Sequence, residues 1–168
     1  MSSPRRVVTG HDADGRSVVL EDAPVARSHS IPDATFHEVW NTGETPALIP
    51  AREPRERTTR PLVTPPDPGG TIARVVDLEP GSLSPMHRTE TVDYGVVLEG
   101  RVVLVLDDGS ETALEPGDVV VQRGTNHAWS NPGEQSARMA FVLVDGRFGD
   151  ELRGLIGDTQ LYNHPLDT

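Results

Sequence analysis

From Thr71 to Gly146 the sequence consists of short apolar runs that are interrupted by turns at regular intervals. The runs include TIARVVDLEPG, VDYGVVLEG, RVVLVLDDG and ARMAFVLVDG, and almost no helical periodicity separates them. Turn sequences such as DDGS, EPGD and NPGE supply the glycine and proline that tight turns require. Many short strands with turn signals at this spacing predict an all-β fold, either a sandwich or a barrel.

The N-terminal third has a different character. RRVVTG and RSVVLED are β-branched runs separated by HDADG, which predicts a β-hairpin whose polar turn ends at Gly15. One more strand is expected around Phe36 to Trp40. The following AREPRERTTRPLVTPPDPGG combines charge and proline so densely that neither a helix nor a central strand is expected there.

These changes in character predict three segments. Residues 1–60 form an N-terminal hairpin and an extended arm that packs on the barrel or on a partner subunit. Residues 61–150 form the barrel, and residues 151–168 form a tail with a short helix near Glu151 to Ile156.

The composition excludes several classes of partner. The chain has 15 Lys and Arg against 26 Asp and Glu, and the net charge of -11 repels a phosphate backbone. We therefore expect no nucleic-acid partner. The chain has no cysteine, which excludes disulfides and thiolate chemistry. No run of about 18 apolar residues is present, so we expect a cytoplasmic protein with no membrane partner.

The segment PMHRTETVDYG, residues 85–95, concentrates polar and ionisable side chains just ahead of an apolar run. Side chains alternate between the two faces of a strand, so His87, Thr89 and Asp93 are expected on one face. A second histidine, His127, follows about 40 residues later. Two imidazoles and one carboxylate can form a metal site with open positions for water and substrate. The sequence therefore predicts His87, Asp93 and His127 as metal ligands.

The same three residues support a second interpretation that needs no metal. Histidine titrates near neutral pH, so His87 and His127 can act as general acid and base. In this interpretation the neighbouring carboxylate of Asp93 raises the histidine pKa and orients the site. His87, His127 and Asp93 are the predicted catalytic residues in either case.

Strand alternation also predicts the walls of the cavity. Trp129 is expected to contact the ligand, because it lies two residues from His127 on the same face. The other predicted walls are apolar and suit a small, partly hydrophobic ligand. They are Val97, Val119, Val121 and, from the run RMAFVLV, either Met139, Phe141 and Leu143 or the residues between them. We predict substrate contacts from Trp129, Thr89, Phe141 and Met139.

The order of these residues resembles the cupin superfamily. Its first motif is Gly, five residues, His-x-His, three or four residues, Glu, six residues, Gly. In this sequence Gly81, His87, Asp93 and Gly100 stand at the corresponding positions. Asp93 replaces the Glu, and Thr89 stands where the second His of the motif belongs.

The second cupin motif is similar to the stretch that begins at Gly117 and leads through Gln-Arg-Gly to His127 and Asn131. Gln replaces the Pro of the motif, with one residue fewer before it. The resemblance covers roughly Thr71 to Gly146 and implies a small jelly-roll barrel. The predicted fold class is thus an all-β cupin jelly-roll barrel with an N-terminal β-hairpin arm.

A complete cupin site resembles three His and one Glu, and this chain departs from that set. Asp93 has a shorter side chain than Glu, and the hydroxyl of Thr89 is a poor ligand for a divalent transition metal. Two outcomes stay open. The site holds one divalent ion, which could be Fe, Mn, Zn or Ni, or it works without a metal.

The resemblance implies a small-molecule substrate. The leading hypothesis is a cupin enzyme that performs proton-transfer chemistry on a carbonyl- or hydroxyl-bearing metabolite, of the dehydratase, isomerase, cyclase or lyase type. The alternatives are an Fe(II)-dependent dioxygenase and a non-catalytic cupin that binds or senses a small ligand. We also expect a homodimer, because the N-terminal hairpin offers strands that can cover a sheet edge of a neighbouring subunit.

Overall fold

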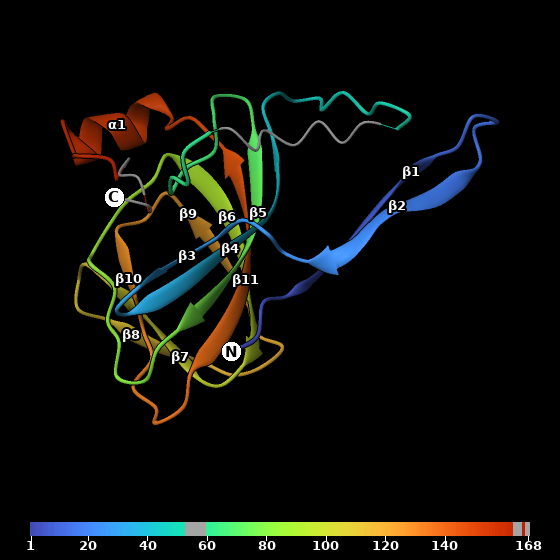
Figure 1. Cartoon of the computed structure of the whole chain (residues 1–168). Helices are drawn as coiled ribbons and strands as arrows, with labels where there is room; N and C mark the ends of the chain where they lie inside the picture. Colours follow the sequence, from blue (N-terminus) through green and yellow to red (C-terminus); the bar gives the residue numbers. More distant parts are fainter. Residues whose placement is uncertain (53–59, 163–165, 167–168) are drawn as a thin grey trace.

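The computed structural model describes residues 1–52, 60–162 and 166 of the chain, and strands dominate it (Figure 1). The strands are β1 (Arg5–His11), β2 (Ser17–Pro24), β3 (Ser28–Ile31), β4 (Ala34–Thr42), β5 (Thr71–Leu78), β6 (Thr91–Glu99), β7 (Val102–Leu106), β8 (Glu111–Leu114), β9 (Val119–Arg123), β10 (His127–Ser130) and β11 (Ala137–Asp145). One helix, α1 (Asp150–Ile156), follows the last strand. The predicted fold class and the predicted short helix are confirmed.

Six strands form one antiparallel sheet in the order β3-β4-β5-β11-β6-β9. The burial of β6 shows why its sequence forms a strand of this sheet. Thr91, Asp93, Gly95 and Val97 are buried, whereas Tyr94 between them is exposed. Successive side chains of a strand point to opposite faces, so every second residue of β6 faces the interior. This alternation turns the Asp93 carboxyl inward.

A three-stranded sheet, β10-β7-β8, completes the barrel and contributes to the same interior. The buried cluster draws on both sheets and consists of Ala34, Val76, Leu78, Val97, Val102, Leu114, Trp129, Ala137 and Met139. Each fully buried aliphatic side chain of this kind stabilises a fold by roughly 1.5–3 kcal/mol. The cavity described below borders this cluster and shares Ala34, Val76, Leu78 and Trp129 with it.

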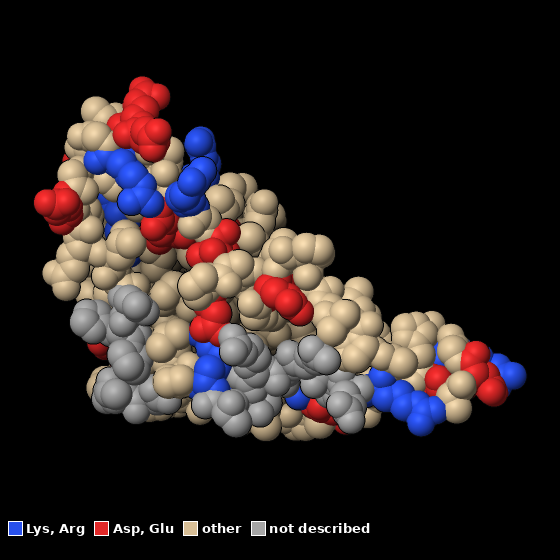
Figure 2. Space-filling model, turned by 90° about the horizontal axis from the view of Figure 1, so that it is seen from above, with Lys and Arg blue, Asp and Glu red and all other residues tan. Residues whose placement is uncertain are grey.

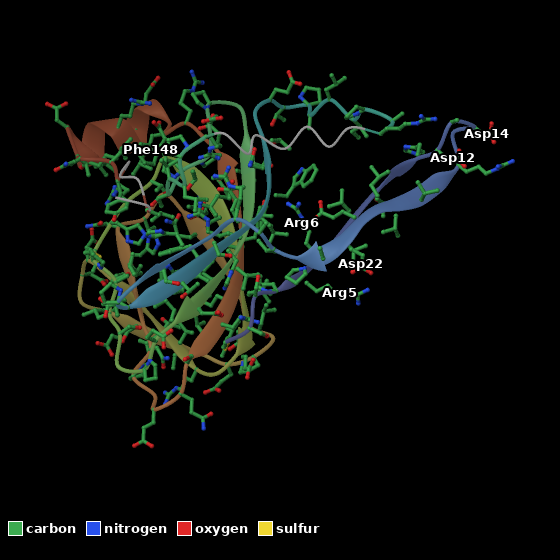
Figure 3. All side chains as sticks on the ribbon, in the orientation of Figure 1. Arg5, Arg6, Asp12, Asp14, Asp22 and Phe148 are labelled. Carbon is green, nitrogen blue, oxygen red and sulfur yellow. The ribbon has the colours of Figure 1, made fainter. Side chains whose placement is uncertain are left out.

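The strands β1 and β2 form a hairpin of their own, which projects from the barrel (Figure 1). Arg5 and Asp22 form an ion pair across the two strands at 2.6 Å, and Asp12 accepts backbone N–H groups in the turn (Figure 3). Figure 2 shows acidic and basic residues close together along this projection. The predicted hairpin is confirmed, and the homodimer that it suggested stays a prediction.

The predicted boundary at residue 60 differs from the observed arrangement. The strands β3 and β4 belong to the six-stranded sheet, where β4 pairs with β5 over its whole length. The barrel therefore begins before residue 60, because β4 satisfies the backbone hydrogen bonds of one edge of β5. The strand expected around Phe36 to Trp40 is β4. Residues 53–59 of the predicted arm lie outside the described residues.

The helix α1 is tied to the barrel through Glu90. Its carboxylate accepts a hydrogen bond from the backbone N–H of Phe148 at 2.7 Å and one from Arg153 at 2.7 Å. The ring of Phe148 lies against Gly124, where an added Cβ would come within 2.4 Å of it (Figure 3). Across the described ranges, no helix has the length and apolar character that crossing a membrane requires.

Candidate active site

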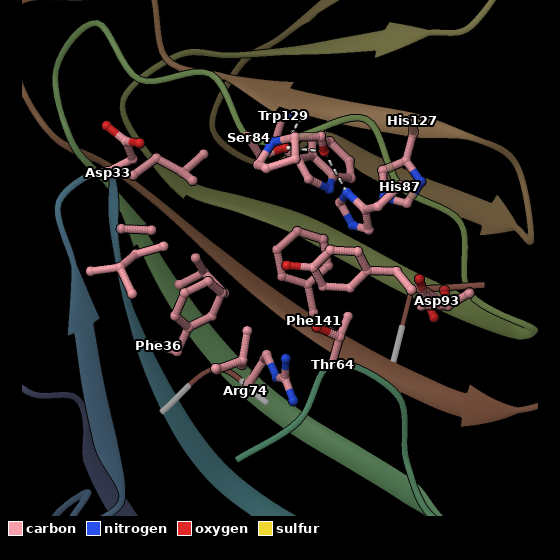
Figure 4. A pocket seen from close by; sticks show the side chains of 18 of the residues that line it. Asp33, Phe36, Thr64, Arg74, Ser84, His87, Asp93, His127, Trp129 and Phe141 are labelled. Atoms are coloured by element: carbon pink, nitrogen blue, oxygen red, sulfur yellow. Dashed lines mark hydrogen bonds between the residues drawn. The ribbon is translucent and has the colours of Figure 1, made fainter. Parts of the chain in front are cut away.

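A cavity of about 150 Å³ lies in the barrel interior, between the six-stranded sheet and β10 (Figure 4). Most of its surface is apolar or aromatic, and a few charged and polar groups converge on it. The lining residues are Ile31, Asp33, Ala34, Phe36, Thr64, Arg74, Val76, Leu78, Ser82, Ser84, Pro85, His87, Thr89, Asp93, His127, Trp129, Phe141, Leu143, Tyr162 and Leu166. Such a lining is typical of small-molecule sites.

The two predicted histidines meet at one wall of this cavity. The backbones of His87 and His127 form a reciprocal pair of hydrogen bonds, each 2.9 Å long, which joins the segment before β6 to the start of β10. The two imidazole centroids are consequently 4.4 Å apart. The main chain itself therefore sets the distance between the rings.

One nitrogen of each imidazole is held by the protein. His87 Nδ1 lies 2.8 Å from the carbonyl oxygen of Pro85, which can only accept, so Nδ1 carries the proton. His127 Nδ1 lies 3.0 Å from both the side-chain amide nitrogen of Gln122 and the carbonyl oxygen of Thr125. Neither Nε2 atom has a hydrogen-bond partner in the described part of the chain. The Nε2 atoms are therefore available to a ligand.

Both imidazoles are neutral at physiological pH. Burial lowers the pKa of His127 to about 4, with a further contribution from the nearby His87. Burial also lowers the pKa of His87, against a smaller opposing effect of its hydrogen bond to Pro85. The expectation that Asp93 raises the histidine pKa was wrong, since loss of hydration in the interior outweighs any attraction of the carboxylate.

Asp93 is buried on the inner face of β6 and has an unusual carboxyl group. Burial raises its pKa to about 6, although a hydrogen bond from Thr91 and the charge of Arg74 oppose that shift. Its Oδ1 atom is buried and has no hydrogen-bond partner among the described residues. The group can therefore exchange a proton close to neutral pH.

The predicted metal set is assembled only in part. A metal ion of the predicted kind needs three protein ligands around one point. Within residues 1–52, 60–162 and 166, no group of three or more His, Asp or Glu side chains is placed to hold an ion. His87 and His127 lie together, but Asp93 does not complete a set with them. The hydroxyl of Thr89 is engaged with Thr91 at 2.7 Å.

The predicted substrate contacts divide into two groups. Trp129, Thr89 and Phe141 line the cavity, as expected. Met139 does not, because it is fully buried in the apolar cluster one step further along β11. It is a core residue, and its assignment as a substrate contact was wrong.

The other predicted walls divide in the same way. Leu143 lines the cavity, and Val97 lies in the core. Val119 and Val121 are 61% and 54% exposed, so their prediction as walls was wrong. Both belong to the outward-facing set of the edge strand β9, where Val121 is the cross-strand partner of the exposed Tyr94.

Arg74 and Tyr162 are two of the cavity residues that the sequence did not predict. Arg74 lies on β5, inside the run TIARVVDLEPG, and is only 5% exposed. Arg74, Val76 and Leu78 are alternate residues of β5 and therefore share one face. Because Val76 and Leu78 face the cavity, this alternation could have identified Arg74. Tyr162 comes from the C-terminal tail, and its ring lies 5.2 Å from that of His87. No local pattern marks Tyr162.

Gly95 shapes the cavity by giving room to Phe141. A Cβ at this position would lie 2.9 Å from the Phe141 ring, which in turn packs edge-on against Trp129. We expect Gly95→Ala to displace the ring and to lower the free energy of unfolding by about 1–3 kcal/mol. Urea denaturation measures this change. The control must avoid a glycine with a positive φ, such as Gly109, because alanine is strained there. Gly149→Ala, at an open and extended position, should cost much less.

Comparison with known proteins agrees with the cupin fold. The family model described as a cupin domain matches residues 74–144. "Phomopsin biosynthesis cluster protein C'" of Diaporthe leptostromiformis is 40% identical over 153 residues, which cover 88% of this chain and 81% of that protein. "Cupin-domain-containing oxidoreductase fogC" of Aspergillus ruber is 40% identical over 147 residues, which cover 83% of this chain and 71% of that protein.

A solved structure supports the fold over nearly the whole chain. The Schizosaccharomyces pombe Cnp3 cupin domain aligns with a TM-score of 0.53 and covers 94% of this chain and 97% of that chain. The sequence identity is 11%, so the likeness concerns the fold alone.

Proposed function

The chain belongs to the cupin family, and we propose that it is an enzyme that moves a proton on a small metabolite bearing a carbonyl or hydroxyl group. One observation carries the proposal. Two neutral imidazoles lie 4.4 Å apart in a largely apolar cavity, each with Nδ1 engaged by the protein and Nε2 without a partner among the described residues. Nε2 of His87 is suited to accept a proton because Nδ1 carries the ring proton, and Nε2 of His127 accepts or donates one according to its tautomer.

The side chains support a simple sequence of steps. Nε2 of one imidazole removes a proton from a carbon next to the carbonyl group, or from a hydroxyl group, and becomes positively charged. Return of that proton to another substrate atom gives an isomer. Alternatively, the Asp93 carboxyl, whose pKa of about 6 allows it to be protonated near neutral pH, donates a proton to a leaving hydroxyl. The product is then that of a dehydratase.

The relatives support the substrate class and favour a second candidate reaction. Their names place them among biosynthesis cluster proteins and cupin-domain-containing oxidoreductases of fungi. The first name supports a small metabolite as substrate. The name cupin-domain-containing oxidoreductase favours an oxidation, such as that of an Fe(II)-dependent dioxygenase. In such a reaction the imidazoles would not act as general acid and base.

One experiment separates the two reactions. A host that lacks the gene accumulates the substrate, which is isolated and incubated with the purified protein in D₂O under measured oxygen. We expect one deuterium to enter the product at carbon, or water to be lost, with no oxygen uptake. Oxygen consumption equal to the product formed, without deuterium at carbon, would instead establish the oxidation. Tight binding without turnover would indicate a sensing protein.

A further inference from the structure

Arg74 is a buried cation on the wall of the cavity. It lies on the inner face of β5, opposite Phe141 of β11, and only 5% of it is exposed. Burial lowers its pKa to about 10, which still leaves the guanidinium charged at neutral pH. Figure 4 shows Arg74 and the two imidazoles on opposite sides of the cavity.

No carboxylate of the described chain pairs directly with this guanidinium. Nη2 of Arg74 donates a hydrogen bond to the carbonyl oxygen of Val63 at 2.7 Å. Glu38 is its cross-strand neighbour and acts on Arg74 through its charge, but the contacts of the Glu38 carboxylate are with Arg27 at 3.4 Å and Asn41 at 2.9 Å.

Asp93 acts on Arg74 only through its charge, without a hydrogen bond or ion pair between the two side chains. A buried cation without an ion-pair partner is costly, and a bound anion removes that cost. A guanidinium presents its donors in a planar fork that fits the two oxygens of a carboxylate.

We propose that Arg74 binds the carboxylate of the substrate, which is a monocarboxylic acid with a flat apolar body. This inference rests on the proposed function and adds the substrate class. A single carboxylate is favoured because Arg74 is the only Lys or Arg among the described residues that line the cavity. Asp33 and Asp93 also line it, and they would repel a second anionic group.

The rest of the ligand is defined by an aromatic wall that leads from Arg74 to the imidazoles. Phe141, beside Arg74, packs edge-on against Trp129 with ring centroids 5.4 Å apart. Trp129 in turn lies 5.5 Å from the imidazole of His127. A flat body along this wall presents its far end to the histidines. The cavity volume of about 150 Å³ suits a single ring, since engineered cavities of about that size bind benzene.

Benzoate and benzamide test the inference on the wild-type protein. They have the same shape, but only benzoate is an anion at pH 7.5. We expect isothermal titration calorimetry to give a Kd for benzoate at least tenfold lower than that for benzamide. Equal affinities, or a stronger affinity for phenyl phosphate, would overturn the proposal. This comparison needs no variant and is independent of any effect of substitution on folding.

Variants assign the effect to Arg74. Arg74→Gln should weaken benzoate binding at least tenfold and leave benzamide binding unchanged, and Arg74→Lys should restore part of the benzoate affinity. Arg123→Gln, which changes an exposed arginine of β9 outside the cavity, should bind benzoate like the wild type. Unchanged benzoate affinity in a folded Arg74→Gln protein would contradict the proposal.

The two proposals can fail separately. His127→Ala should lose turnover of the isolated substrate and should still bind benzoate. If benzoate binds through Arg74 but no proton transfer is found, the carboxylate site stands and the proposed reaction fails. If proton transfer occurs on a substrate without a carboxylate and Arg74→Gln leaves its rate unchanged, the reaction stands and the carboxylate site fails.

Discussion

Replacing His127 by alanine is expected to lower kcat for the isolated substrate by a factor of about 10²–10⁴, the usual contribution of a general acid or base. The imidazole is neutral, its Nδ1 is engaged by Gln122 and Thr125, and its Nε2 is available to the substrate. Alanine removes the imidazole that transfers the proton but keeps the two backbone hydrogen bonds to His87. Steady-state kinetics at pH 7.5 measures the loss.

The barrel should remain folded in this variant, and near-UV circular dichroism checks that it does. His29→Ala is the control, because His29 lies on β3 of the six-stranded sheet and does not line the cavity. Its kcat should equal that of the wild type. A His127→Ala protein that is folded and turns over the substrate at the wild-type rate would exclude the proposed mechanism.

Replacing Asp93 by asparagine is expected to stabilise the protein above pH 7 by about 3 kcal/mol, since each pKa unit corresponds to 1.36 kcal/mol. The sign follows from the raised pKa of Asp93, which is about 6 in the folded protein against 3.8 in the absence of the fold. Below pH 3.8 the carboxyl is protonated in both states and adds no penalty. As the pH rises to about 6 and above, the folded state carries an increasingly disfavoured charge.

Urea denaturation from pH 4 to pH 8 tests this prediction. The difference between Asp93→Asn and the wild type should be near zero at pH 4 and should reach its full size by pH 7. Asp33→Asn changes a second, exposed carboxylate of the cavity and serves as the control. A difference that shrinks as the pH rises would show that ionised Asp93 stabilises the fold.

Most of the fold could be predicted from side-chain alternation along the strands and from the spacing of the turns. Alternation along β6 predicted that Asp93 faces inward, and the spacing of turns predicted the succession of strands from β5 to β11. The motif resemblance paired His87 with His127 across about 40 residues, and the two rings do meet. These features are periodic or local, so a sequence displays them directly.

Alternation along a strand does not show where the strand lies in its sheet, and the wall residues predicted wrongly reflect this. Val121 alternates as a wall residue should, but it lies on the outward face of an edge strand. Met139 shares its face with Phe141, yet it lies deep enough to belong to the apolar core. Alternation shows which residues of a strand share a face. The neighbouring strands decide whether that face meets the core, the cavity or solvent.

The chain itself determined the all-β fold, the N-terminal hairpin, the pair of histidines and the inward carboxyl of Asp93. Only the tertiary structure decided that Tyr162 joins them, because it comes from the C-terminal tail, far from the two motifs. Alternation along β5 turns Arg74 inward, but only the tertiary structure decided that its inner face meets the cavity. The tertiary structure also reversed the expected direction of the histidine pKa. Hydration is lost only when the barrel closes over the rings, and that loss outweighs the charge of any neighbour that the sequence shows.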